Sequence, residues 1–91
     1  MSVRIEFLGP LKQVVGGEEV IELEADTIAG VIERLSERYE GVSDRLLEPD
    51  GALHRHINIY VNEEDIRFKK QQQTALSPGD VVTVISAIAG G

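Results

Sequence analysis

The end of the chain offers a chemical group that no side chain provides. The last residues are Ala87-Ile88-Ala89-Gly90-Gly91, so the chain stops on a glycine pair. Lacking Cβ atoms, such an end cannot supply an acid, a base or a metal ligand. It can carry a backbone carboxylate on a thin, flexible stem into a narrow channel. The alternative is a frayed terminus, because chain ends are often poorly ordered.

The side chains give little sign of an internal active site. The chain has no cysteine, which excludes disulfides, thiolate metal sites and cysteine nucleophiles. No serine lies in a nucleophile elbow, and Gly16-Gly17 lacks the lysine and hydroxyl residues of a phosphate-binding loop. We therefore predict that the chain is not an enzyme and that its chemistry comes from a partner.

Two acidic or histidine-rich stretches are candidate metal sites. His54 and His56 are two residues apart, so on a strand both would point to one face and could bind zinc or copper. No third ligand is identifiable by spacing, which favours surface histidines. Glu63-Glu64-Asp65 does not match a calcium-binding loop and is better explained as a solvated turn. We predict no metal site and no cofactor bound by this chain.

Composition limits the class of protein and its partners. The chain has 91 residues, 42% of them hydrophobic and 27% charged, which suits one soluble globular domain. Its apolar runs are too short to span a membrane, and its start lacks a signal-peptide layout, so we expect a cytoplasmic protein. The net charge of −7 disfavours nucleic acids and anionic membranes and favours a basic partner surface.

Alternation of apolar and polar residues predicts three strands before the end of the chain. They lie at Val3–Phe7, Ile21–Ala25 and Ile57–Val61. A glycine-containing loop joins the first two, which suggests an antiparallel hairpin. Its outer face is acidic because it carries Glu22 and Glu24.

One amphipathic helix is predicted between the second and third strands. Thr27 is a good N-cap, and Gly41 stands where a helix usually stops. The apolar positions that fall on one helical face are Ile28, Val31, Ile32, Leu35 and Tyr39. A single apolar stripe indicates that the helix covers one face of a sheet.

The remaining segments are read from turns and short apolar runs. Ser43 is a candidate cap for a short helical turn, and residues Asn62–Asp65 form a polar turn. Ile66–Phe68 is expected to be a brief returning strand, followed by a polar surface connection over residues 69–74. A turn at Ser77–Asp80 then delivers a final strand at Val81–Ile85.

This order of elements predicts an α+β fold. We expect a mixed, four- to five-stranded sheet covered on one face by one main helix. Residues 1–91 form a single domain, in which residues 86–91 are a flexible tail. The last strand is expected to be central, so it would anchor a tail reaching up to about 20 Å at about 3.3–3.6 Å per residue.

The residues that carry a family resemblance extend along the whole chain. They are the helix led by Thr27, the Asn62 turn after Val61, the Gly79-Asp80 turn and the Ala89-Gly90-Gly91 end. With these features the chain resembles the ubiquitin-like sulfur-carrier family, which includes the molybdopterin-synthase small subunit and the thiamine sulfur carrier. The stretch LHRHINIYVNEEDIRF, residues 53–68, and the longer loop over residues 41–53 are closer to the branch that feeds sulfur into cysteine biosynthesis in actinobacteria.

The resemblance implies a β-grasp fold and a reaction cycle at Gly91. A partner enzyme would adenylate the Gly91 carboxylate with ATP, and sulfide or a persulfide would displace AMP to leave a thiocarboxylate. ATP and the sulfur donor would act through partners. In the cysteine branch the thiocarboxylate would attack an aminoacrylate on a pyridoxal-phosphate-dependent cysteine synthase, and a zinc peptidase would release cysteine.

Two alternatives share the activation step. In the molybdopterin branch the tail would insert into a large synthase subunit. That branch often has prolines where this chain has Ser86 and Ala87, which favours the cysteine branch. A ubiquitin-like protein modifier would instead join Gly91 to a lysine by an isopeptide bond, and the sequence does not separate this alternative from a carrier. A plain interaction domain with an inert tail is the third interpretation.

The site residues that follow from the resemblance lie mainly in the tail. Gly91 supplies the reactive carboxyl group, Gly90 and Ala89 give access, and Ile88 is a docking contact.

Three residues outside the tail are secondary candidates for partner contact. They are Phe68 and the acidic pair Glu22 and Glu24. For Phe68, packing in the core is the favoured interpretation.

Overall fold

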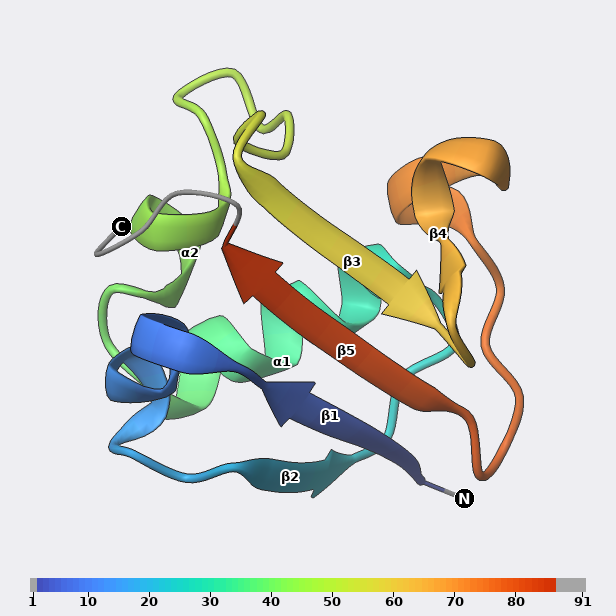
Figure 1. Cartoon of the computed structure of the whole chain (residues 1–91), viewed down its shortest axis with the longest axis horizontal. Helices are drawn as coiled ribbons and strands as arrows, with labels where there is room; N and C mark the ends of the chain where they lie inside the picture. The colour runs from blue at the N-terminus through green and yellow to red at the C-terminus, as the bar shows by residue number, and fades with distance from the viewer. Residues whose placement is uncertain (1, 87–91) are drawn as a thin grey trace.

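A five-stranded mixed sheet forms the centre of the molecule. A computed structural model describes residues 2–86, and Met1 and residues 87–91 lie outside this description. The strand order is β2-β1-β5-β3-β4, and helix α1 lies behind one face of the sheet (Figure 1). The strands are β1 (Val3–Phe7), β2 (Val20–Leu23), β3 (Ile57–Val61), β4 (Glu64–Asp65) and β5 (Val81–Ser86). This arrangement confirms the predicted α+β class.

Strand β5 occupies the central position that we predicted for it. It runs parallel to β1, with Ile5 opposite Val82, and antiparallel to β3, with Ile57 opposite Ser86. The strand is one residue longer than the predicted Val81–Ile85, because Ser86 still pairs with β3. The strand therefore includes Ser86, which the sequence analysis assigned to the tail.

Helix α1 (Ile28–Arg38) has the predicted start and the predicted buried face. The Oγ1 atom of Thr27 accepts a hydrogen bond from the backbone N–H of Gly30 at 3.1 Å, which satisfies one of the free donors of the first turn. The apolar residues of this helix that are buried are Ile28, Val31, Ile32 and Leu35. No helix within residues 2–86 is both long and apolar enough to cross a membrane.

The core lies between helix α1 and the inward-facing residues of the sheet. The buried strand residues are Val3, Ile5, Phe7, Ile21, Leu23, Ile57, Ile59, Val61, Val82 and Val84. Because side chains alternate along a strand, the residues between them point to the opposite face, which the helix does not cover.

Two connections are more regular than expected. Residues Gly9–Val15 form a 3-10 helix with Pro10 in its first turn, where the missing N–H of proline costs no hydrogen bond. The short helix α2 (Val42–Leu46) is preceded by Gly41, whose φ of 83° is left-handed. Gly41, and not the predicted Ser43, is therefore the N-cap residue of α2.

The segment after β3 differs from the prediction. Asn62 and Glu63 both have positive φ, 50° and 75°, and they form a tight two-residue turn. The returning strand therefore starts directly at Glu64 and ends at Asp65. The side chain of Asp65 accepts a hydrogen bond from the backbone N–H of Arg67, and residues Ile66–Phe68 form a 3-10 helix rather than a strand.

Candidate functional site

The structure describes the base of the tail and not the tail itself. The predicted site residues Gly91, Gly90, Ala89 and Ile88 lie outside the described residues. The last described residue before them is Ser86, which we call the tail root.

The tail root is fixed by strands on both sides of β5. Ser86 pairs with Ile57 of β3, and the preceding Ile85 pairs with Asn58. On the other side, the backbone N–H of Leu8 donates to the carbonyl oxygen of Val84 at 3.1 Å. The chain therefore leaves the sheet from a strand that is paired along both edges almost to its end.

The start of β5 is fastened by a polar network. The side-chain amide of Asn62 donates to Asp80 Oδ1 at 2.9 Å, and its oxygen accepts from the N–H of Val81 at 3.0 Å. The other oxygen of Asp80 accepts from the N–H of Ser77 at 2.8 Å. These hydrogen bonds hold the pKa of the Asp80 carboxyl below its ordinary value. The bond from the Ser77 N–H has the larger effect and the bond from the Asn62 side chain the smaller one. The network therefore fixes the direction in which β5 enters the sheet.

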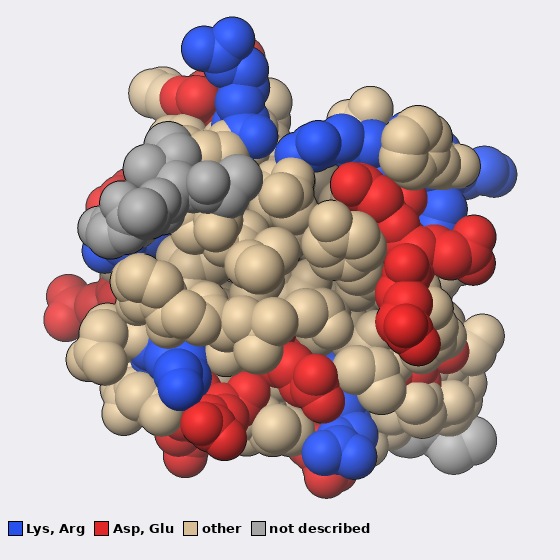
Figure 2. Space-filling model, in the orientation of Figure 1, with Lys and Arg blue, Asp and Glu red and all other residues tan. Residues whose placement is uncertain are grey.

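The sheet face opposite α1 carries an apolar patch beside the tail root. Leu8 and Val20 are 44% and 40% exposed, and both follow the outward alternation of their strands. Phe7 lies opposite Val84, so Leu8 comes next to Ile85. We call Leu8, Thr83 and Ile85 the sheet-face patch; Val20 is separated from it by Glu6 of β1. Figure 2 shows this face, where uncharged residues occupy the centre and charged side chains surround it.

The predicted acidic contacts lie elsewhere. Glu22 and Glu24 are exposed, as expected, at the β2 edge of the sheet. Glu22 is paired with Arg4 of β1. Glu22 and Glu24 line a shallow hollow beside α1, together with Arg34. Strand β1 lies between them and β5, so the structure does not bring them to the tail root.

The expectation that Phe68 packs in the core is wrong. Its side chain is 89% exposed, whereas Ile66, two residues earlier, is 1% exposed. In a strand these two residues would share one face, but the 3-10 helix has about three residues per turn and separates them. Phe68 is therefore available for contact with a partner.

The two histidines lie in the loop before β3 and not on a strand. Their rings stack with centroids 5.2 Å apart. His54 Nδ1 is 3.1 Å from a carboxylate oxygen of Glu48, and Nε2 is 3.2 Å from the carbonyl oxygen of Asp44. Both ring nitrogens of His54 thus have protein partners. In the described part of the chain, no three His, Asp or Glu residues are grouped so as to hold a metal ion.

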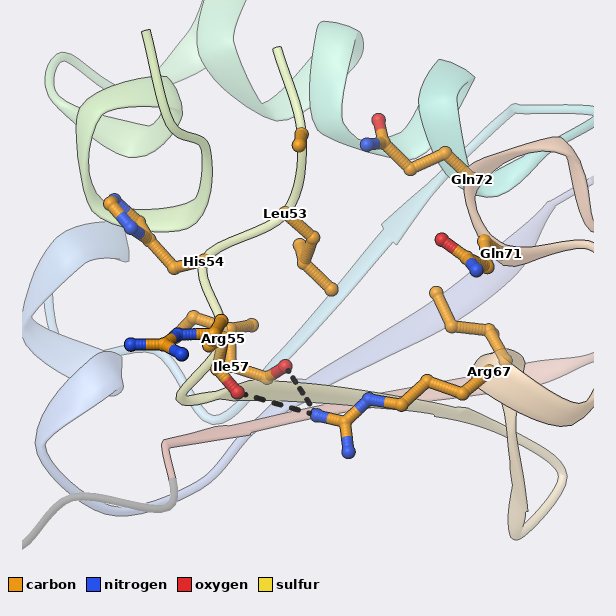
Figure 3. Close-up of a pocket in the computed structure, with 9 residues that line it drawn as sticks. Leu53, His54, Arg55, Ile57, Arg67, Gln71 and Gln72 are labelled. Atoms are coloured by element: carbon orange, nitrogen blue, oxygen red, sulfur yellow. Dashed lines mark hydrogen bonds between the residues drawn. The ribbon is translucent and has the colours of Figure 1, made fainter. Parts of the chain in front are cut away.

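A cavity next to β3 was missed by sequence reasoning. It has a volume of roughly 440 Å³, and its apolar lining comes from Leu53, Ile57 and Ile66. Figure 3 shows Arg67 beside it, with its guanidinium group directed towards the carbonyl oxygens of Arg55 and Ile57. The lining residues come from a loop, the first residue of β3 and two short 3-10 helices within residues 52–72, which have no regular period, so no spacing in the sequence indicates this cavity.

The described residues can position a reactive end at the close of β5. His54 is bonded to Glu48 and to a backbone carbonyl, and Asp80 is held as a carboxylate within a turn. Strand β5 ends at Ser86, where it is paired with β3. The sheet-face patch lies on the face opposite α1, and the cavity lies next to β3.

The ThiS family matches residues 5–91. The chain is 42% identical over 93 residues to the sulfur carrier protein CysO of Mycobacterium tuberculosis, with the whole of both chains covered. It is 31% identical over 93 residues to small archaeal modifier protein 3 of Haloferax volcanii, again with both chains fully covered.

A solved structure agrees with the fold. A chain in the crystal structure of the Amycolatopsis orientalis BexX/CysO complex is 35% identical, with a TM-score of 0.88. The match covers 98% of this chain and 99% of that one. The expected ubiquitin-like β-grasp fold is thereby confirmed.

Proposed function

This chain belongs to the ThiS family, and we propose that it is a sulfur carrier whose reactive group is the carboxylate of Gly91. The observation that carries this proposal is the extent of the family match, which runs through Gly90 to Gly91. The full-length similarity to a sulfur carrier of Mycobacterium tuberculosis supports delivery of the sulfur to cysteine biosynthesis. In this cycle the chain is a carrier and co-substrate of partner enzymes rather than a catalyst.

The proposed chemistry explains why the reactive group must be activated elsewhere. A carboxylate is a poor electrophile because its oxygen is a poor leaving group. In the adenylating enzyme, an oxygen of Gly91 attacks the α-phosphorus of ATP and releases pyrophosphate. Sulfide then attacks the carbonyl carbon, the bond to AMP breaks, and a thiocarboxylate remains. No electrons are gained or lost, so the step needs no further reductant.

The body of the protein supports this cycle by holding the tail root and offering a docking surface. The sheet-face patch borders Ser86, so an enzyme that takes up the following residues comes close to Leu8 and Ile85. Burying such apolar groups stabilises a complex by about 25 cal/mol per Å² of apolar surface. The net charge of −7 adds attraction to a basic enzyme surface, mainly through the association rate.

The test is reconstitution with a purified adenylating enzyme of the same organism, ATP and sulfide. Intact mass spectrometry should show the exchange of one oxygen for sulfur, with one pyrophosphate released for each chain modified. A chain lacking Gly91 should keep the same melting temperature and gain no sulfur. Modification of the truncated chain would show that the Gly91 carboxylate is not the reactive group.

The pathway needs a second assay. The thiocarboxylated chain is mixed with a pyridoxal-phosphate-dependent cysteine synthase and an activated serine, and we expect a protein–cysteine adduct that a zinc peptidase then cleaves. If only a large molybdopterin synthase subunit consumes the sulfur, the molybdopterin alternative holds instead.

Protein modification is a second candidate function. The similarity to a small archaeal modifier protein favours testing it. Conjugates between Gly91 and lysine side chains would appear as high-mass species that survive reducing gels. Their absence in cells in which the thiocarboxylate is detected would exclude this function under those conditions.

A further inference from the structure

We propose that Arg67, Phe68, Lys69 and Lys70, with the cavity beside them, form a second docking surface for the adenylating enzyme. We call these residues and the cavity the β4-edge surface. It fits a partner surface that presents an apolar side chain next to an acidic group. The inference rests on the proposed function, because that function supplies the partner.

Phe68 is the apolar centre of this surface. At 89% exposure it is far more accessible than the other large exposed apolar residues of the described chain. The backbone beside it is held in place, because Ile66, two residues earlier, is buried in the core. The N–H of Lys69 donates to the carbonyl oxygen of Ile66 at 3.0 Å, which closes the turn around Phe68. A large aromatic side chain held in water by such a turn is typical of an interface residue.

The segment after Phe68 is also held in place. The N–H of Lys70 donates to Thr74 Oγ1 at 3.2 Å, and Thr74 is 2% exposed. The carbonyl oxygen of Thr74 accepts from the N–H of Ile28 at 3.2 Å, which ties the segment to the start of α1. The surface is therefore preformed, so binding to it requires little ordering of the chain.

The charge of this surface is opposite to that of the protein as a whole. Positions 67–70 hold three of the nine Lys and Arg residues, and positions 66–79 contain no acidic residue, although the net charge is −7. Lys69 also approaches Glu64 at 3.6 Å, but its side chain keeps 34% exposure. Figure 2 shows basic side chains along this edge of the molecule, with acidic side chains next to them. Because Arg67 donates to backbone carbonyls and Lys69 lies beside Glu64, Lys70 is the basic residue of this surface that most favours an acidic group on the partner.

The cavity connects the β4-edge surface with the region of the tail root. Ile57 lines the cavity and pairs with Ser86, so the cavity borders the tail root. An enzyme that contacts both the tail root and this cavity has to extend across β3. Leu53 supplies the accessible apolar lining, since Ile57 and Ile66 are almost fully buried. The guanidinium group of Arg67 closes one side of the cavity, where it donates to the carbonyl oxygens of Arg55 and Ile57 (Figure 3).

The experiment measures the adenylation of variants by the purified enzyme at a range of carrier concentrations. Phe68→Ala should raise KM about tenfold with little change in kcat, as expected for loss of an interface anchor. Lys70→Glu should raise KM about threefold to tenfold, with the effect shrinking as salt is added. Arg34→Glu makes the same change of charge at an exposed position of α1 and should stay within about twofold of wild type.

The outcomes separate this inference from the proposed function. KM values of Phe68→Ala and Lys70→Glu that match the Arg34→Glu value would overturn the docking surface while adenylation remains intact. If the wild-type chain is never adenylated, the proposed function itself fails. A concentration-dependent dimer of the wild type that Phe68→Ala abolishes would assign the surface to a second copy of the chain and overturn the proposal. Phe68→Leu should retain most of the affinity, which excludes unfolding as the cause.

Discussion

Arg67 closes the edge of β3 next to the tail root, and its removal should loosen that end of the sheet. Strand β4 pairs with β3 at Tyr60 and Val61, so the first half of β3 extends beyond it. There the guanidinium group of Arg67 donates to the carbonyl oxygens of Arg55 and Ile57, each at 3.4 Å. A further contact joins it to the side-chain oxygen of the next residue, Asn58.

The size of the effect follows from these bonds. A hydrogen bond in a folded protein contributes about 0.5–1.5 kcal/mol net, and the two carbonyl contacts of this exposed arginine are long. We therefore assign about 1 kcal/mol to Arg67 as a whole, which corresponds to roughly fivefold more frequent local opening. The opening should be confined to the end of β3 and to its partner residues Ile85 and Ser86.

Amide hydrogen exchange followed by NMR measures this directly. In Arg67→Ala, the amides of Asn58, Ile85 and Ser86 should exchange about fivefold faster at unchanged pH and temperature. Arg38→Ala is the matched control, because Arg38 is also exposed and donates to one backbone carbonyl, that of Glu22, at 3.4 Å. Equal exchange in the two variants, or acceleration spread over the whole sheet, would refute the local role of Arg67.

Two further predictions concern stability. Thr27→Ala removes the acceptor for the N–H of Gly30 and should cost about 1 kcal/mol, lowering the melting temperature by about 4–8 °C in circular dichroism. A melting temperature equal to that of the wild type would contradict the capping role. The pKa of Asp80 is lowered by Ser77 and Asn62, so its contribution to stability is present above the ordinary pKa of aspartate and is lost as the pH falls through the lowered value. Urea midpoints should therefore depend less on pH in Asp80→Asn than in the wild type over that acidic range, and parallel pH profiles would argue against it.

The parts of the fold that could be predicted are those in which a local pattern and the tertiary environment agree. Val3–Phe7 alternates, and its apolar residues face the core. Thr27 has the side chain that a helix start requires, and it caps that start. In both cases the physical cause lies within a few neighbouring residues, so the sequence is sufficient.

The segment around Phe68 could not be predicted in the same way. Three residues are too few to distinguish a strand from a 3-10 helix by periodicity. The difference from the predicted strand begins earlier in the chain, where Asn62 and Glu63 both adopt positive φ. The polar residues Asn62–Asp65 predict a turn, but a glutamate with positive φ is uncommon, so the sequence does not show that the turn has only two residues. The turn shortens the loop, moves the strand to Glu64 and leaves Phe68 outside the core.

The candidate site was predictable in its chemistry and not in its surroundings. The terminal glycines can be read directly and carry the family resemblance. The sheet-face patch exists only after distant segments meet, as when Leu8 comes beside Ile85, and the cavity exists only after the loop before β3 folds against residues 66–72. These contacts depend on strand order and register, which cannot be read residue by residue from one sequence.

The central place of β5 has a consequence for how the protein is made. Residues 81–86 are inserted between β1 and β3, and the parallel pairing with β1 joins segments almost a whole chain apart. Pairings of this kind form late, because a long loop must close before they are gained. During synthesis, the sheet therefore cannot close until the last strand has left the ribosome. An interrupted chain would have neither a finished sheet nor a presented tail, so unfinished copies would not compete for the partner enzyme.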